Sequence, residues 1–273
     1  MTFDMSKAWN EAMAMISANK EVLAVVSGIF FFLPTVLAGL LQPDAGLEAV
    51  MQTDDMDATQ AAMLQMFSDY WWLFGLTILL QMIGYVALIA LLGRSGRPTV
   101  GEAISAGLVG MIPAILAYAI LIFAFSILAG TVLAMTIASK IPLLIALAVL
   151  ATLFSGIFVT MRTILFLPAI AIDQEMNPIK TLVRSWHLTK GSALYLFAFF
   201  ALLTVALVVI SLVAQLLAMG VGALLGEDGA LLVVSIVGAV IGSAGAAVTA
   251  AVLTAAYRQL AGPPAGEAAQ AFD

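Results

Sequence analysis

Six long apolar stretches dominate the sequence, and each is long enough to cross a lipid bilayer. A membrane-spanning helix needs roughly 20 consecutive, mostly apolar residues, because a rise of about 1.5 Å per residue must cover a hydrocarbon core about 30 Å thick. The stretches cover residues 22–41, 70–92, 108–136, 141–168, 193–219 and 230–257. We therefore predict an all-α integral membrane protein, with six transmembrane helices forming one bundle and residues 1–273 forming a single membrane domain.

The composition agrees with this fold class. Apolar residues make up 63% of the chain and charged residues 10%, and the mean hydropathy is +1.14. A soluble domain has roughly 45–50% apolar and about 25% charged residues. A chain this apolar cannot cover its core with a polar surface, so the bilayer is its natural solvent.

Several kinds of site lack the residues that they would need. Ten Lys and Arg against sixteen Asp and Glu leave no basic surface for nucleic acid. The chain has no cysteine and one histidine, and the six stretches contain no Asp, Glu or His. We therefore expect no catalytic residues, no cofactor and no metal centre within the membrane.

The acidic loop over residues 42–69 invites two metal hypotheses. Asp54, Asp55 and Asp57 are oxygen ligands of the kind that calcium prefers, but the loop lacks the central Gly and distal Glu of a helix–loop–helix calcium site. Its methionines are soft ligands of the kind that copper prefers. They fit better as the apolar side of a short helix over residues 59–72, lying on the membrane. These methionines are Met51, Met56, Met63 and Met66.

The basic residues of the loops predict the orientation. With six spans both termini lie on one side of the membrane. That side carries Lys7, Lys20, Arg94, Arg97, Lys180, Arg184, Lys190 and Arg258, whereas the other side carries Lys140 alone. Because cytoplasmic loops are enriched in Lys and Arg, we predict that both termini are cytoplasmic and that residues 42–69 form an outer loop.

Polar segments precede the first, third and fifth spans, and each predicts an amphipathic helix at the membrane interface. They cover residues 4–20, 98–110 and 177–190. The third begins with Asn177 and Pro178, a typical helix start. Its apolar stripe consists of Ile179, Leu182, Val183 and Trp186, and Lys180, Arg184 and His187 follow about 100° round the helix. The alternative is that these segments are plain cytoplasmic linkers.

A pattern around the fourth span resembles a known family. The run from Arg162 through Pro168 to Asp173, then Pro178, Ser185-Trp186 and Lys190-Gly191, is similar to YciC-like bacterial inner-membrane proteins and to the membrane domain fused to some glycerophosphoryl diester phosphodiesterases. The resemblance implies a membrane fold in the bacterial inner membrane. It does not imply phosphodiesterase activity, because in the fused relatives the chemistry belongs to a separate soluble barrel for which this chain has no room.

Arg162 is the one charged side chain inside a predicted span, and such residues usually face the protein interior or reach for the interface. Our functional hypothesis is that Arg162, Lys180, Arg184 and Lys190 contact the headgroup of an anionic membrane lipid. The alternatives for Arg162 are that it reaches the headgroups without specific recognition, or that it pairs with Glu102 or Asp173 and fixes helix packing.

Small residues in the sixth span predict a close helix contact. Gly238, Gly242 and Ala246 recur every four residues, which allows helices to approach closely. The contact is either intramolecular or the seam of a homo-oligomer.

The sequence thus favours a non-catalytic, lipid-interacting or scaffold protein of the cell envelope, with membrane lipids or another membrane protein as partners. The alternative is a transporter or permease-like subunit, for which prolines in or beside four spans argue. These prolines are Pro34, Pro113, Pro142 and Pro168.

Overall fold

The fold is known from a computed structural model that describes residues 3–41, 56–94 and 98–262. Every regular element in these ranges is a helix. Six helices are long and apolar enough to cross a membrane, which confirms the six predicted spans. They cover Lys20–Leu41, Met56–Gly93, Val100–Ala138, Pro142–Asp173, Ala193–Gly222 and Gly229–Ala261.

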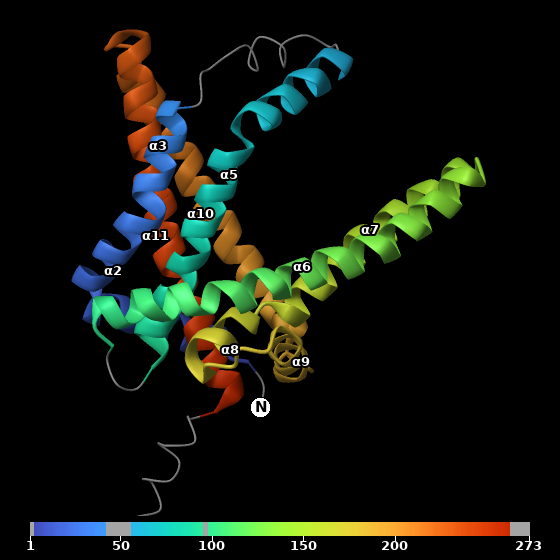
Figure 1. The fold of residues 1–273 in the computed structure, drawn as a ribbon, viewed down its shortest axis with the longest axis horizontal. Coiled ribbons are helices and arrows are strands. Elements are labelled where there is room, and N and C mark those ends of the chain that lie inside the picture. Colours follow the sequence, from blue (N-terminus) through green and yellow to red (C-terminus); the bar gives the residue numbers. More distant parts are fainter. Residues whose placement is uncertain (1–2, 42–55, 95–97, 263–273) are drawn as a thin grey trace, which may run out of the picture.

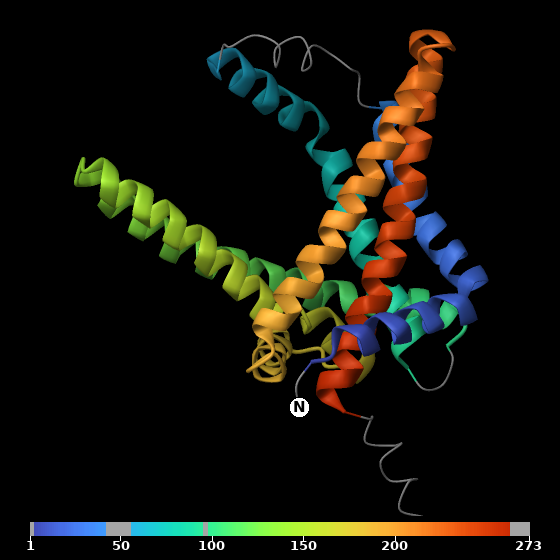
Figure 2. The same ribbon diagram turned by 180° about the vertical axis from the view of Figure 1, so that it is seen from behind.

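The membrane-length helices fall into two groups (Figures 1 and 2). Helices α10 (Ala193–Gly222) and α11 (Gly226–Ala261) pack along each other, and α5 (Met56–Gly93) and the first span contact α11. Helices α6 (Val100–Ala138) and α7 (Pro142–Thr163) form a hairpin that points away from this group.

Three shorter helices lie at one end of the bundle, which we call the α8–α9 end. They are α1 (Met5–Ala18), α8 (Phe166–Asp173) and α9 (Pro178–Leu188). Figure 2 shows α1 crossing α11 at this end, close to the N-terminus. The buried Ala8 and Ala12 of α1 let the two helices approach closely, so α1 packs on protein as well as at the bundle end.

The first span is continuous but contains a π-helical turn. It consists of α2 (Lys20–Ser27), the π turn η1 (Gly28–Phe32) and α3 (Leu33–Leu41). Pro34 lies two residues after the turn and has no N–H to donate to the carbonyl four residues earlier. The N–H of Leu33 instead reaches the Gly28 carbonyl, which widens the helix by one residue at this point.

The buried core lies where α5, α8, α11 and the first half of α6 meet. Its largest fully buried side chains include Leu88, Ile89, Ile170 and Tyr257. Gly107 brings the backbones of α5 and α6 together, since a Cβ at this position would lie 2.5 Å from the Ile83 carbonyl oxygen. In a membrane such close approach replaces the hydrophobic driving force that packs soluble helices.

The structure corrects three details of the predicted layout. Residues 56–69 belong to the continuous helix α5, so they form neither an irregular loop nor a separate short helix. Residues 100–110 are the first turns of α6, because Thr99 and Glu102 form a capping box that starts the helix at Val100, and the helix continues through Pro113 to Ala138. The predicted spans leave residues 220–229 between them, whereas α10 ends at Gly222 and α11 begins at Gly226, so the turn covers residues 223–225 alone. The predictions for residues 42–55 lie outside the described residues.

Candidate functional site

The fourth span is broken between Thr163 and Phe166, and this break determines how the helices of the α8–α9 end are placed. Helix α7 ends at Thr163, and α8 starts at Phe166 after a turn. Pro168 lies four residues after Ile164, so its ring occupies the place of the helical hydrogen bond to the Ile164 carbonyl and clashes with that carbonyl. The helix therefore breaks one turn before the proline.

Hydroxyl groups of α9 and the residue that follows it replace the backbone partners lost at the break. The Leu165 N–H donates to Ser185 Oγ at 3.1 Å, and Ser185 Oγ donates to the Arg162 carbonyl at 3.1 Å. Thr189 Oγ1 lies 3.0 Å from the same carbonyl. Leu165, Ser185 and Thr189 are fully buried, and in a membrane an unsatisfied backbone group is costly, so these hydroxyls hold α9 in place.

The orientation of α9 differs from the predicted one. Its buried face consists of Thr181, Leu182 and Ser185. In the predicted apolar stripe, Ile179, Val183 and Trp186 are 61%, 49% and 37% exposed. The reason is the break, since the hydroxyls must point inward and most of the apolar stripe is left to face outward. An outward apolar stripe suits a helix lying at the membrane interface.

Arg162 is buried in the contact between α7 and α9, with only 7% of its surface exposed. Its guanidinium carbon lies 4.6 Å from the centre of the Trp186 ring and 6.0 Å from that of Phe158. Its Nε atom is buried and has no hydrogen-bond partner. No carboxylate of the described residues forms an ion pair with Arg162.

The two carboxylates that the sequence offered to Arg162 are bound elsewhere. Glu102 accepts hydrogen bonds from the backbone N–H and the hydroxyl of Thr99 at the start of α6. Asp173 forms an ion pair with Arg184, whose Nε lies 2.6 Å from the Asp173 carboxylate oxygen. In the described part of the chain, Arg162 therefore forms no ion pair with Glu102 or Asp173, which was one of the predicted alternatives.

Asp173, Arg184 and Tyr257 join α8, α9 and α11. Arg184 Nε donates to the Tyr257 hydroxyl at 2.7 Å, and that hydroxyl donates to Asp173. Burial favours the neutral form of Arg184, but the Tyr257 hydrogen bond and the Asp173 charge outweigh it and raise the pKa of the guanidinium. Arg184 therefore stays charged and is fixed through Nε.

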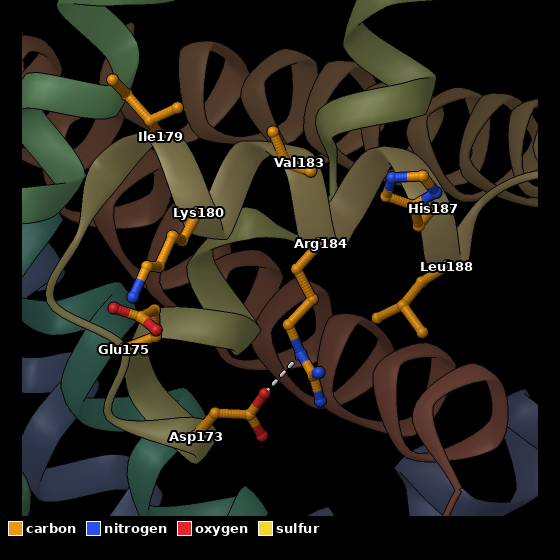
Figure 3. Close-up of a pocket in the computed structure, with 8 residues that line it drawn as sticks. All are labelled: Asp173, Glu175, Ile179, Lys180, Val183, Arg184, His187 and Leu188. Carbon is orange, nitrogen blue, oxygen red and sulfur yellow. Dashed lines mark ion pairs between the residues drawn. The ribbon is translucent and has the colours of Figure 1, made fainter.

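A pocket with a volume of about 580 Å³ opens beside this triad (Figure 3). We call it the α9 pocket; it is lined by Asp173, Glu175, Ile179, Lys180, Val183, Arg184, His187 and Leu188. In Figure 3, Lys180 and Arg184 project from the same side of α9, Lys180 towards Glu175 and Arg184 towards Asp173. Two carboxylates and two cations thus give the pocket a formal charge of zero when His187 is neutral.

The four predicted headgroup residues therefore do not form one cluster. Trp186, which covers Arg162, and Arg184, which lines the α9 pocket, are two residues apart and lie about 200° apart around the helix. Lys180 joins Arg184 in the pocket. Lys190 is exposed in the turn between α9 and α10 and has no ion pair with a described residue.

Two apolar grooves flank α7 on the face opposite Arg162. One, of about 730 Å³, lies between α7 and α10, and the other, of about 430 Å³, lies between α7, α6 and α8. Gly156 and Thr160 of α7 line both grooves. Arg162 follows Thr160 by two residues, so its side chain leaves α7 about 200° round the helix from that of Thr160. Neither groove is lined by a charged side chain.

The small residues of the sixth span have different surroundings. A Cβ at Gly238 would lie 2.6 Å from Gln215 Nε2, so the Gln215 side chain of α10 packs against this glycine. Ala246 is buried in the core. Gly242 has nothing within 4 Å of a Cβ placed on it. The structure thus places Gly238 and Ala246 in intramolecular contacts and leaves Gly242 open.

In the part of the chain that the structure describes, no three side chains of His, Cys, Asp or Glu come together as metal ligands would. Met56, Met63 and Met66 lie along α5, whereas Met51, Asp54 and Asp55 are outside the described residues. The absence of a metal site and of a cofactor remains a prediction.

Sequence reasoning missed Ser185, Thr189, Glu175 and Tyr257. The spacing of Ser185 and Thr189, four residues apart after a Pro-containing span, was an available signal for the hydroxyl pair. No comparable signal connects Asp173 with Tyr257, which lies 84 residues away.

Six membrane-length helices with a broken fourth span define a multi-pass helical membrane protein. Comparison with protein-family models, with curated proteins and with solved structures finds no match for this chain. The resemblance to YciC-like proteins and to the phosphodiesterase membrane domain therefore stays a prediction from its motif.

Proposed function

We propose that this chain is a non-catalytic, multi-pass inner-membrane protein that binds anionic lipid headgroups at its α8–α9 end. The excess of Lys and Arg in the loops supports a cytoplasmic position for this end and for both termini. A lipid-binding scaffold needs no catalytic group, and the single histidine and the lack of cysteine agree with that.

The observation that carries the proposal is the buried Arg162 guanidinium, which has no carboxylate partner among the described residues. A buried charge left without its partner costs about 3–5 kcal/mol. The contacts with Trp186 and Phe158 return about 0.5–2 kcal/mol. The difference favours an anion supplied from outside the chain, and a lipid phosphate is the anion available at a membrane interface.

A transporter is the second candidate, and the break between α7 and α8 is the observation that favours it. Transporter sites are often built on discontinuous helices, whose free backbone groups bind substrate or ions. Here, however, the Leu165 N–H and the Arg162 carbonyl are bound by Ser185 and Thr189, which leaves these two groups unavailable to a substrate. The lipid-binding function is therefore the better supported of the two.

The proposal is tested by native mass spectrometry of the full chain released from phosphatidylglycerol-containing membranes. We expect the wild type to retain phosphatidylglycerol, Arg162→Met to lose most of it, and Arg162→Lys to retain an intermediate amount, because Lys keeps the charge but not the planar donor fork. Lys140→Gln is the matched control, since Lys140 lies at the opposite end of α7. Identical phosphatidylglycerol adducts on the wild type and a folded Arg162→Met would refute the proposal.

A further inference from the structure

We propose that the α9 pocket binds a lipid headgroup that carries both a phosphate and a primary ammonium group, as phosphatidylethanolamine does. Arg184, the cation at the centre of this site, lies about 200° round α9 from Trp186, which covers Arg162, so the two sites are distinct. The inference rests on the proposed function only in placing the α8–α9 end at the level of the headgroups.

Arg184 supplies the phosphate side of the site. Its Nε is held by Asp173 and Tyr257, whereas neither terminal nitrogen is hydrogen-bonded to a described residue. In Figure 3 the guanidinium end of the side chain lies beside the Asp173 carboxylate. A guanidinium fixed at Nε keeps two parallel N–H donors free, which is the arrangement that binds a phosphate in a bidentate manner.

Glu175 supplies the ammonium side. One of its carboxylate oxygens accepts the Asn177 N–H at 3.0 Å, which fixes the side chain, and the other has no hydrogen bond to a described residue. In Figure 3 this carboxylate lies beside the end of Lys180, at the opposite side of the pocket from Leu188. A primary ammonium group can donate N–H bonds to the free oxygen and compete with the Lys180 amine for it.

The charge of the pocket selects between headgroup classes. Two carboxylates and two cations line it, so a headgroup with a net negative charge brings a phosphate near Asp173 and Glu175 without offering them a cation. A zwitterionic headgroup gives each charge an opposite partner. A choline headgroup lacks N–H donors and is usually bound by aromatic rings, and no Phe, Tyr or Trp is among the lining residues of this pocket.

The remaining lining residues give the lipid tails a route to the bilayer. Ile179 and Val183 belong to the exposed apolar stripe of α9 and also line the pocket. A headgroup between Arg184 and Glu175 therefore has apolar side chains next to its glycerol and first methylene groups. This continuity distinguishes a lipid site from a site for a free phosphate or a free amine.

The test measures lipid binding to the delipidated full chain by native mass spectrometry. The probes are phosphatidylethanolamine, its mono- and dimethylated forms, phosphatidylcholine and phosphatidylglycerol, all with the same acyl chains. We expect phosphatidylethanolamine to bind at least about tenfold more tightly than phosphatidylcholine, with affinity falling at each methylation, because each step removes an N–H donor to a carboxylate. Soluble phosphoethanolamine, which lacks tails, is expected to compete only weakly.

Two variants locate the effect. Glu175→Gln keeps the size of the side chain and an acceptor for the Asn177 N–H, and we expect it to remove most of the preference for phosphatidylethanolamine over phosphatidylcholine. Glu21→Gln, at an exposed glutamate of α2, is the matched control and is expected to leave that preference unchanged.

The outcomes separate this inference from the proposed function. Equal affinity for phosphatidylethanolamine and phosphatidylcholine, or a preference that survives Glu175→Gln, overturns the inference and leaves the Arg162 proposal standing if phosphatidylglycerol still depends on Arg162. Failure of the wild type to bind any of the lipids overturns both.

Discussion

Removing the Ser185 hydroxyl is expected to destabilise the protein more than any other single serine-to-alanine change in the helices described. Ser185 Oγ uses both of its hydrogen-bonding roles at the break, accepting from the Leu165 N–H and donating to the Arg162 carbonyl. In Ser185→Ala the buried Leu165 N–H loses the only partner that the structure gives it.

The expected loss of stability depends on which hydrogen bonds the Leu165 N–H and the Arg162 carbonyl keep in the variant. An unsatisfied buried N–H costs about 1–3 kcal/mol. The Arg162 carbonyl is less affected, because Thr189 Oγ1 has one proton, lies near three carbonyls and can turn fully to Arg162. Alanine returns at most about 0.5 kcal/mol through its higher helix propensity. We expect a net loss of about 2 kcal/mol for Ser185→Ala and about 1 kcal/mol for Thr189→Val.

The assay is unfolding of the full chain in mixed detergent micelles, followed by tryptophan fluorescence. Ser155→Ala is the control, since Ser155 is exposed on α7 and its hydroxyl bonds only to the Thr152 carbonyl of its own helix. It is expected to change stability by less than about 0.5 kcal/mol. The double variant Ser185→Ala/Thr189→Val is expected to lose more than the sum of the single changes, because the Arg162 carbonyl then has no hydroxyl left.

Equal stability of the Ser185→Ala and Ser155→Ala proteins would refute the account of the break, and so would strict additivity of the double variant. Either result would mean that the backbone groups at residues 162–165 find partners without α9.

Two further predictions concern packing and topology. Gly107→Ala is expected to destabilise the protein by about 1–3 kcal/mol in the same unfolding assay, because the new Cβ would lie 2.5 Å from the Ile83 carbonyl oxygen. Gly101→Ala in the same helix is the control. Its Cβ would have open space, so this change should be neutral or slightly stabilising. Because the chain has no cysteine, single cysteines report topology directly. Lys140→Cys should react with a membrane-impermeant maleimide on intact cells and Lys180→Cys only after permeabilisation, and the reverse pattern would invert the predicted orientation.

The fold class could be predicted from the sequence because hydropathy is a local property. A long apolar run has no alternative to crossing the bilayer as a helix, since lipid offers no partner for free backbone groups. The tight turn after Ala138 was also predictable from a local feature, because Ser139 and Lys140 are a short polar segment between two long apolar runs. Helix length was less predictable, because residues 56–69 are polar enough for a loop and yet continue α5.

The candidate site was only partly predictable. The amphipathic character of α9 and its start at Asn177 follow from the sequence, and the structure shows both. Which face of α9 is buried depends on the hydrogen bonds between Ser185 and the break that follows α7. These bonds join residues about twenty positions apart, and the periodicity of α9 alone does not predict them. The partners of Asp173 lie on α9 and α11, so its pairing with Arg184 rather than Arg162 is likewise a result of tertiary packing.

The break also explains why the basic residues divide into two sites. The helix breaks before Pro168, and the Leu165 N–H and the Arg162 carbonyl left at the break need a buried hydroxyl that both accepts and donates. Ser185 meets that need only if it points inward. Neighbouring helix residues lie about 100° apart, so Arg184 and Trp186 are then directed to opposite flanks of α9. Arg184 meets Asp173 on one flank, Trp186 covers Arg162 on the other, and one serine hydroxyl thereby separates the two proposed headgroup sites.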